Sequence, residues 1–121
     1  MGDAGIVPLG GKDVAAIYVG GTHVCALRKS GEVNCWGDNG NGQLGVGNTA
    51  ELRVPSAALS LGSGFVPRAM ALGGSHTCAI SIQDRVKCWG QGGAGQLMNG
   101  SFSDVGSGPG QMGDALPYSG L

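Results

Sequence analysis

The sequence predicts an all-β fold built from two copies of one repeat, and three observations lead to this prediction. The chain of 121 residues has 26 glycines but only 5% aromatic and 12% charged residues, a balance that favours a fold dense in tight turns. No Gly-X-Y period is present, which excludes collagen, and 41% hydrophobic residues argue against simple disorder. The third observation is a long internal repeat.

The repeat relates residues 20–44 to residues 73–97. The first segment reads GGTHVCALRKSGEVNCWGDNGNGQL, and the second reads GGSHTCAISIQDRVKCWGQGGAGQL. A constant offset of 53 residues aligns the two segments without a gap. The offset pairs these residues: His23 with His76, Cys25 with Cys78, Cys35 with Cys88, Trp36 with Trp89, and Gln43 with Gln96.

The repeat also predicts how the chain is divided. We expect the first unit to span residues 1–60 and the second to span residues 61–111. The tetrapeptide MGDA at residues 1–4 returns at residues 112–115. Residues 112–121 are therefore expected to begin a third repeat phase, as they would in a piece of a longer array.

Three strands are expected in the first repeat. The apolar run AAIYV at residues 15–19 ends at two glycines and predicts a buried strand. HVCAL at 23–27 and EVNCWG at 32–37 flank a short turn and predict a hairpin. A three-residue loop with a left-handed Gly31 places Leu27 opposite Val33 and Cys25 opposite Cys35. Residues 53–61 are the candidate for a fourth strand.

The second repeat predicts the same hairpin register. Ile80 falls opposite Val86, and Cys78 falls opposite Cys88. Asp84 replaces the turn glycine, and aspartate tolerates the left-handed region better than most residues. Three to four strands per repeat fit one blade of a β-propeller. Two blades do not close a ring, so we expect an incomplete propeller unless the chain oligomerises or belongs to a longer array.

The repeated residues resemble those of a known family. The pattern G-G-x-H-x-C-A-L, followed by G-x-V-x-C-W-G-x-N and G-Q-L-G-x-G, is similar to the regulator of chromosome condensation repeat over most of residues 14–98. The form with cysteine and CWG resembles bacterial multi-repeat proteins and plant receptor ectodomains. The resemblance implies a β-propeller, typically of seven blades. Met98 replaces the glycine that ends this loop in the first repeat, Gly45, so we expect a reshaped second loop.

The four cysteines have three interpretations. The predicted register favours two disulfides, Cys25–Cys35 and Cys78–Cys88, because opposed residues on antiparallel strands lie close together. Free buried thiols are the alternative. A zinc site is disfavoured because the sequence lacks the close C-x₂₋₄-C ligand pair that zinc requires. Disulfides imply an oxidising compartment, so we expect an extracellular or cell-surface protein, although residues 1–13 lack the pattern of a signal peptide.

The repeated histidines and tryptophans are expected to be structural. A catalytic histidine needs a nucleophile and an orienting acid, and neither recurs beside His23 and His76. We expect these rings to bond the backbone of a neighbouring loop. Trp36 and Trp89 lie next to cysteine inside a repeated strand, which favours packing between blades over stacking on a ligand.

The loop DNGNGQLGVG is expected to be a turn. It lacks the lysine of a phosphate-binding loop, and Asp38 alone does not make a calcium site. Gln43 and Gln96 are expected to bond backbone groups. Asn99 begins a glycosylation sequon, which matters only in a secreted eukaryotic protein. The sequence therefore predicts no catalytic residue, no metal and no cofactor.

Charge and hydropathy limit the classes of partner that we expect for this chain. The net charge is −1 with no run of Lys or Arg, so neither nucleic acid nor an anionic membrane surface is an expected partner. No apolar run is long enough to span a membrane. The predicted function is a non-enzymatic propeller module that binds protein. The alternative is a structural subunit that forms a homo-oligomer head to tail, as a ring or filament, rather than a stable monomer. A lectin and a guanine-nucleotide exchange factor, the activity of the family's namesake, are less favoured.

Overall fold

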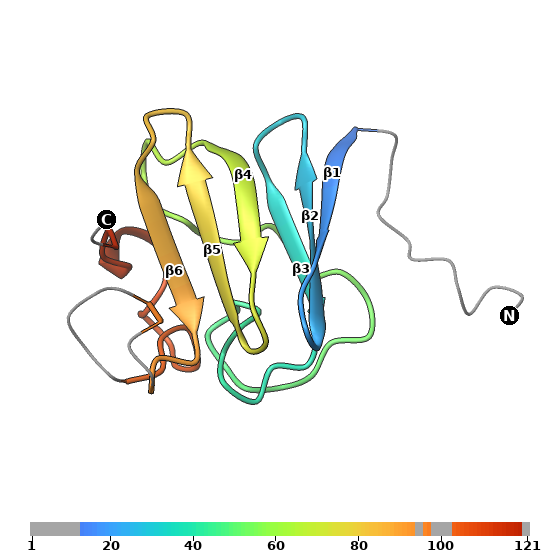
Figure 1. The fold of residues 1–121 in the computed structure, drawn as a ribbon, viewed down its shortest axis with the longest axis vertical. Helices are drawn as coiled ribbons and strands as arrows, with labels where there is room; N and C mark the ends of the chain where they lie inside the picture. Colours follow the sequence, from blue (N-terminus) through green and yellow to red (C-terminus); the bar gives the residue numbers. More distant parts are fainter. Residues whose placement is uncertain (1–12, 94–95, 98–102, 120–121) are drawn as a thin grey trace, which may run out of the picture.

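The computed structural model describes residues 13–93, 96–97 and 103–119 and contains two antiparallel sheets side by side (Figure 1). Each sheet has three strands in sequential order, β1-β2-β3 and β4-β5-β6, and we call the sheets the first and second blade. The strands are β1 (Val14–Val19), β2 (His23–Arg28), β3 (Val33–Gly37), β4 (Pro67–Leu72), β5 (His76–Ser81) and β6 (Val86–Gly90). The prediction of an all-β, incomplete propeller is confirmed.

Both hairpins have the predicted register. Leu27 pairs with Val33 in the first blade, and Ile80 pairs with Val86 in the second. Asp84 occupies the left-handed position of the second turn with a φ of 62°, where the first turn has a glycine with a φ of 93°. The two hairpins therefore share one backbone path despite their different turn residues.

The outer edge of each blade is covered by segments that form no regular strand. Ser56 and Leu59 donate backbone N–H groups to carbonyls of β3, at 2.9 Å each. In the second blade, Ser119 donates in the same way to the carbonyl of Val86 on β6 at 2.7 Å. Leu116, just before this contact, is 1% exposed and lies in the core. Residues 112–119, which include the short 3₁₀ helix η2 (Gly113–Ala115), thus pack against the blades.

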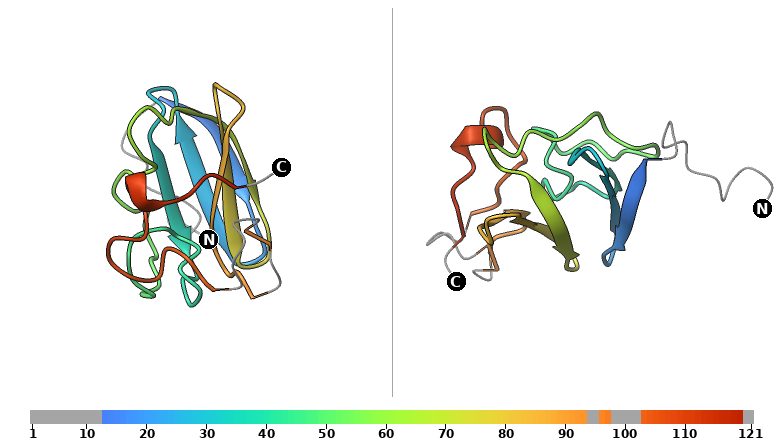
Figure 2. Two further views of the ribbon diagram at one scale, coloured as in Figure 1. Left: turned by 90° about the vertical axis from the view of Figure 1, so that its left-hand side faces the viewer. Right: turned by 90° about the horizontal axis from the view of Figure 1, so that it is seen from above.

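The main core lies between the two blades. Figure 2 shows the sheets fanning apart when the molecule is seen from above, with the strands of one facing those of the other. The hydrophobic residues of this interface come from both repeats, among them Cys25, Leu27, Leu44, Met70, Ala79 and Trp89. Because these side chains come from both repeats, the apolar burial at the junction between blades contributes to the stability of the fold. The only helix in the described ranges is η2, which is too short to cross a membrane.

Candidate functional site

Each blade contains one disulfide that joins the two strands of its hairpin. Cys25 and Cys35 have an S–S distance of 2.07 Å, and Cys78 and Cys88 have one of 2.03 Å. Both pairs lie at opposed positions with Cα atoms 4.1 Å apart. Cys25 and Cys35 are fully buried beneath the second blade, whereas Cys78 is partly exposed. The two disulfides are chemically alike and differ in their access to solvent.

His23 links the two blades through a side chain of the second. Its ring is 2% exposed, and Nε2 lies 2.7 Å from the hydroxyl oxygen of Thr77 on β5. The Thr77 hydroxyl donates its proton to the backbone carbonyl of Gln43 at 2.7 Å. Because a hydroxyl has one proton, His23 must donate through Nε2–H, which leaves Nδ1 unprotonated in the neutral ring. The partner is thus a strand hydroxyl in the next blade, rather than the loop backbone that we expected.

The surroundings of His23 favour the neutral ring. Burial lowers the pKa of His23 and the nearby charge of His76 lowers it further, whereas Asp38 and a backbone hydrogen bond with His76 oppose these effects. His23 Nδ1 is buried and has no hydrogen-bond partner among the described residues. Burial is the largest of these effects, so the pKa of His23 stays below its usual value and the neutral ring is favoured.

Trp89 is the largest side chain at the junction. It is fully buried, and its indole lies on the loop that follows the first hairpin. A Cβ atom added at Gly45 would come within 2.7 Å of the indole Nε1, and Gly45 has a φ of +72°. Both facts require glycine at this loop position. Trp89 therefore packs between blades, and Gly45 gives its ring the space to do so.

The glutamine loops of the two repeats have different surroundings. Gln43 is fully buried, and its Oε1 accepts a hydrogen bond from the backbone N–H of Asn41 at 2.8 Å. Gln96 is partly exposed, with Nε2 3.4 Å from Oε1 of Gln91. The two glutamines therefore differ both in burial and in hydrogen-bond partner. Met98 and Asn99, singled out in the sequence, lie outside the described residues.

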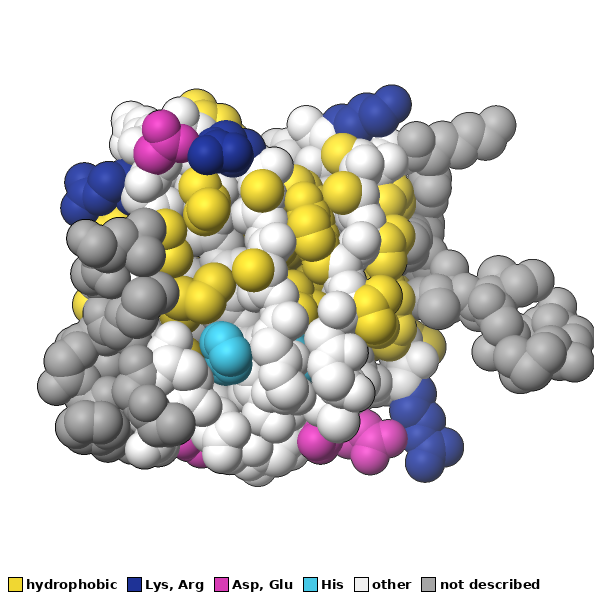
Figure 3. Space-filling model, in the orientation of Figure 1, with side chains coloured by type: hydrophobic (Ala, Val, Ile, Leu, Met, Phe, Trp, Pro, Cys, Tyr) yellow, Lys and Arg dark blue, Asp and Glu magenta, His cyan; other side chains and the backbone are white. Residues whose placement is uncertain are grey.

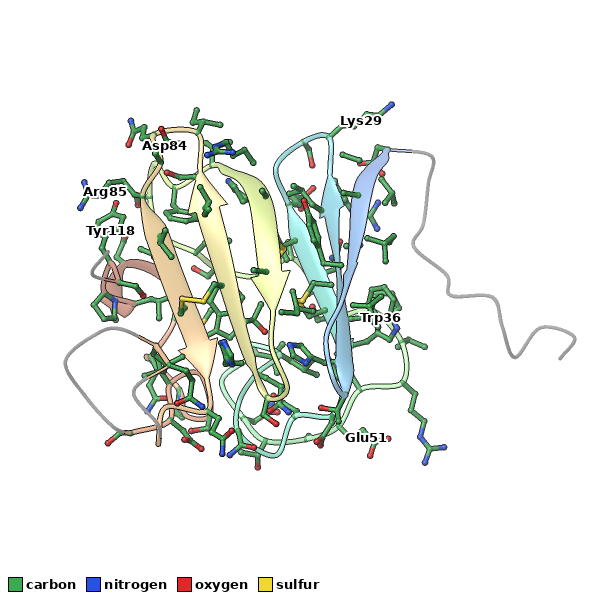
Figure 4. All side chains as sticks on the ribbon, viewed as in Figure 1. Lys29, Trp36, Glu51, Asp84, Arg85 and Tyr118 are labelled. Atoms are coloured by element: carbon green, nitrogen blue, oxygen red, sulfur yellow. A yellow bond between two sulfur atoms is a disulfide. The ribbon has the colours of Figure 1, made fainter. Side chains whose placement is uncertain are left out.

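The counterparts of the junction residues lie at the two ends of the molecule. Trp36, which corresponds to Trp89, is partly exposed and points away from the second blade (Figure 4). His76, which corresponds to His23, is also partly exposed. Each repeat therefore carries both a tryptophan and a histidine of the kind found at the junction. In this chain the junction contains the histidine of the first repeat and the tryptophan of the second.

One side of the first blade is apolar and open, and we call it the upstream face: Ile17, Val19, Val24 and Trp36. Val19 pairs with Val24, and Val24 pairs with Trp36, so these side chains lie side by side across the sheet. Ile17 is 48% exposed and Val19 is 72% exposed. Figure 3 shows hydrophobic side chains over the strands of both blades, with charged groups gathered toward the ends.

The same face of the second blade is covered. At the repeat offset, the upstream face corresponds to Met70, Leu72, Thr77 and Trp89, which lie at the junction with the first blade. Met70 is 7% exposed, and Thr77 and Trp89 are fully buried. The two equivalent surfaces therefore differ in this molecule, because one is covered by a blade and the other is open.

Lys87 stabilises the second blade from within and was missed by sequence reasoning. It is 4% exposed, and Nζ donates to the carbonyls of Leu61 at 2.7 Å and Gly113 at 3.3 Å. Nζ also lies 5.4 Å from the Phe65 ring centre and 5.0 Å from that of Tyr118. Burial lowers the pKa of Lys87, and the charge of Asp114 partly offsets this shift. The only sequence signal is that asparagine occupies this position in the first repeat.

Thr77 was also missed, although the repeat holds a signal for it. The equivalent position in the first repeat is Val24, so one polar residue replaces an apolar one inside an aligned strand. Such a change at a buried position indicates a hydrogen bond, but the partner is known only once the blades are placed.

Potential metal ligands do not cluster in the described part of the chain. There, no group of three or more His, Cys, Asp or Glu side chains lies close enough to hold a metal ion. A groove of about 450 Å³ runs beside the junction. Its lining contains no His, Cys or acidic residue: Gly45, Val46, Gly47, Ala57, Ala58, Leu59, Ser60, Gly108, Pro109, Gly110 and Met112.

Comparison with known families gives one consistent match. The regulator of chromosome condensation (RCC1) repeat matches residues 14–43 and 68–96, and a second description of the same repeat matches residues 30–80. Among the similar proteins is the ultraviolet-B receptor UVR8 of Arabidopsis thaliana, 35% identical over 99 residues, which are 82% of this chain and 22% of UVR8. The mitochondrial RCC1 domain-containing protein RUG3 of the same plant is 38% identical over 74% of this chain and 20% of its own length.

A solved structure has the same blade arrangement. Yeast RCC1 (Prp20), solved bound to Kap60, aligns with a TM-score of 0.61 and 30% identity over 68% of this chain and 19% of Prp20. Prp20 is also described by its binding to Gsp1p and histones. This chain spans about a fifth of the length of each of these three proteins.

Proposed function

We propose that this chain, which belongs to the regulator of chromosome condensation repeat family, is a non-enzymatic protein-binding module that acts by docking blade on blade. The observation that carries the proposal is the upstream face of the first blade. Its side chains are exposed, while the equivalent side chains of the second blade are buried at the junction. An exposed apolar surface with a covered counterpart in the same molecule favours a protein partner.

The relatives support protein as the class of partner. Prp20 is described as binding Kap60, Gsp1p and histones, all of them proteins. Because this chain spans only about a fifth of Prp20, we carry over the class of partner and not the particular partners. A partner that supplies a further blade would extend the array of two blades described above.

We also propose that the protein works in an oxidising compartment, outside the cell or at its surface. The two hairpin disulfides support this location, because such bonds persist where thiols are not kept reduced. The test is the redox state of the four cysteines in protein isolated from its native source under thiol-trapping conditions. Disulfides in both hairpins are expected, and four trapped thiols would contradict the proposal.

The docking function is tested by giving the chain one more blade. An added copy of residues 13–65 is fused directly before Asp13, which preserves the repeat offset, and the copy carries Trp36→Phe for identification. Hydroxyl-radical footprinting then measures the oxidation rate of the chain's own Trp36. We expect a several-fold lower rate than in the chain alone, because the added blade covers this ring.

The matched control for the fusion is Val19→Lys in the chain. Val19 is 72% exposed, so the substitution places a charge on the upstream face without removing internal packing. We expect Trp36 to regain its reactivity in this variant. An oxidation rate that is the same in the fusion and in the chain alone would show that the face does not accept a blade.

Head-to-tail self-assembly is the second candidate, and the partial exposure of His76 and Cys78 on the second blade favours it. In this case the second blade of one copy covers the upstream face of the next. Light scattering over a range of concentrations, with and without reductant, tests it. A mass that grows with concentration above 12.0 kDa supports a homo-oligomer, and a constant mass of one chain contradicts it.

A further inference from the structure

The residues that join the two blades differ between the repeats, and the differences indicate which blade the upstream face fits. We propose that this face binds a blade with glycine at the position of Gly45 and an apolar residue at the position of His23. This inference rests on the docking function proposed above. The second blade of another copy has neither feature, because the second repeat has Met98 at the position of Gly45 and His76 at the position of His23.

The first determinant is the space in front of the tryptophan. In the internal junction, a Cβ atom at Gly45 would approach Trp89 Nε1 to 2.7 Å. Trp36 holds the equivalent position on the upstream face, so a blade docked in the same geometry brings the same loop position against its ring. A side chain there meets the indole, and the positive φ of this position disfavours it further. Glycine fits and methionine does not.

The second determinant is the absence of a hydroxyl. Thr77 accepts the hydrogen bond of His23 in the internal junction. Val24 stands at the equivalent position of the upstream face and offers no acceptor. A histidine docked there would bury its Nε2–H without a partner, which is unfavourable. An apolar side chain in its place contacts Val24 without that cost.

The rest of the surface is suited to an apolar partner. Ile17 and Val19 are exposed, while Met70, the counterpart of Ile17, is 7% exposed beneath the first blade. Leu72, the counterpart of Val19, lies close to the first blade. A Cβ atom added at Gly20 would come within 2.9 Å of the Cβ atom of Leu72. The internal junction is thus a direct template for the contact area of the proposed junction on the upstream face.

The test uses substitutions within the added blade of the fusion described above. Gly45→Met in the added blade should return the oxidation rate of the chain's Trp36 to its value without the added blade. Gly64→Met in the added blade is the matched control, because Gly64 also has a positive φ of +75° but no atom lies within 4 Å of its Cβ position. This control should keep Trp36 protected. Equal protection with Gly45→Met and without it would overturn the proposal.

A second set of variants tests the hydroxyl and leaves Gly45 unchanged. His23→Val in the added blade should slow Trp36 oxidation further when the chain carries Val24. With Val24→Thr in the chain, the preference should reverse, so that histidine protects better than valine. The same order of the two donors in both backgrounds would overturn the inference. A fusion that fails to protect Trp36 with any donor defeats the docking function itself, whereas protection without selectivity defeats only this inference.

Discussion

The Nε2 atom of His23 lies 2.7 Å from the hydroxyl oxygen of Thr77, so a hydrogen bond joins the two blades across 54 positions of sequence. The hydroxyl in turn donates to the carbonyl of Gln43, which fixes the glutamine loop of the first blade against the second. A chain of two hydrogen bonds thus positions the loop whose Gly45 lies on Trp89. Hydrogen bonding and apolar packing act on the same junction.

The junction should weaken in acid because of His23. Burial lowers its pKa, so the folded state binds a proton less readily than the unfolded chain, whose histidines titrate at about pH 6.5. Below that pH the unfolded state binds more protons, and the free energy of unfolding falls as the pH drops toward the lowered pKa. Urea denaturation at about pH 7.5 and about pH 5 measures the difference.

Two variants separate the contribution of His23 from that of the other titrating groups. His23→Gln should lose most of the pH dependence over this interval. His76→Gln keeps the buried ring and should retain most of the dependence, because burial lowers the pKa of His23 more than the nearby His76 does. If wild type and His23→Gln respond to pH alike, His23 is not the group responsible.

Gly45→Ala should destabilise the protein more than Gly64→Ala. Both positions have a positive φ, of +72° and +75°, so each substitution strains the backbone by about 1–3 kcal/mol. Only at Gly45 does the new methyl group also meet the indole of Trp89. The measurement is the urea midpoint of each variant. Equal midpoints would mean that this contact does not shape the junction.

Trp89→Ala should cost far more stability than Trp36→Ala in the isolated chain. Truncation of a fully buried aromatic side chain costs about 3–5 kcal/mol, which is comparable with the whole stability of a small domain. Trp36 is partly exposed, so less packing is lost. Denaturation followed by circular dichroism compares the variants. Well-folded Trp89→Ala protein that melts like wild type would contradict a buried junction.

The disulfides should form within hairpins and should differ in their resistance to reductant. Non-reducing peptide mapping is expected to find Cys25 linked to Cys35 and Cys78 linked to Cys88. A mild thiol should reduce the second pair first, because Cys78 is partly exposed and the first pair is fully buried. A link between Cys25 and Cys78, or four free thiols before reduction, would contradict the pairing.

The strands and their register could be predicted because each hairpin joins residues that are close in sequence, and because the same pattern occurs twice. A pairing proposed in one hairpin, such as Leu27 with Val33, had to hold at the same offset in the other, and it does. The boundary between units near residue 60 stays a prediction. The sequence assigned residues 112–121 to a third phase, and the structure packs Ser119 against β6.

The junction could not be predicted in the same way, because its contacts join residues from different repeats. Alignment identifies Trp36 and Trp89 as equivalents, but only the placed blades show that one is covered and the other open. The burial of Lys87 has a similar origin, since its two carbonyl partners come from the linker and from the end of the chain. Repeated sequence predicts what each blade is, and three-dimensional contacts decide what each blade meets.

This chain has one closed blade junction and an open upstream face, and its two tryptophans report on them in a single molecule. Hydroxyl-radical footprinting of the unmodified chain gives an oxidation rate for Trp36 and for Trp89, which lie in different tryptic peptides. We expect Trp36 to be oxidised several-fold faster, because Trp89 is fully buried between the blades. Equal rates would contradict this arrangement, whether both rings are reactive because the blades do not dock or both are protected because the upstream face is already covered.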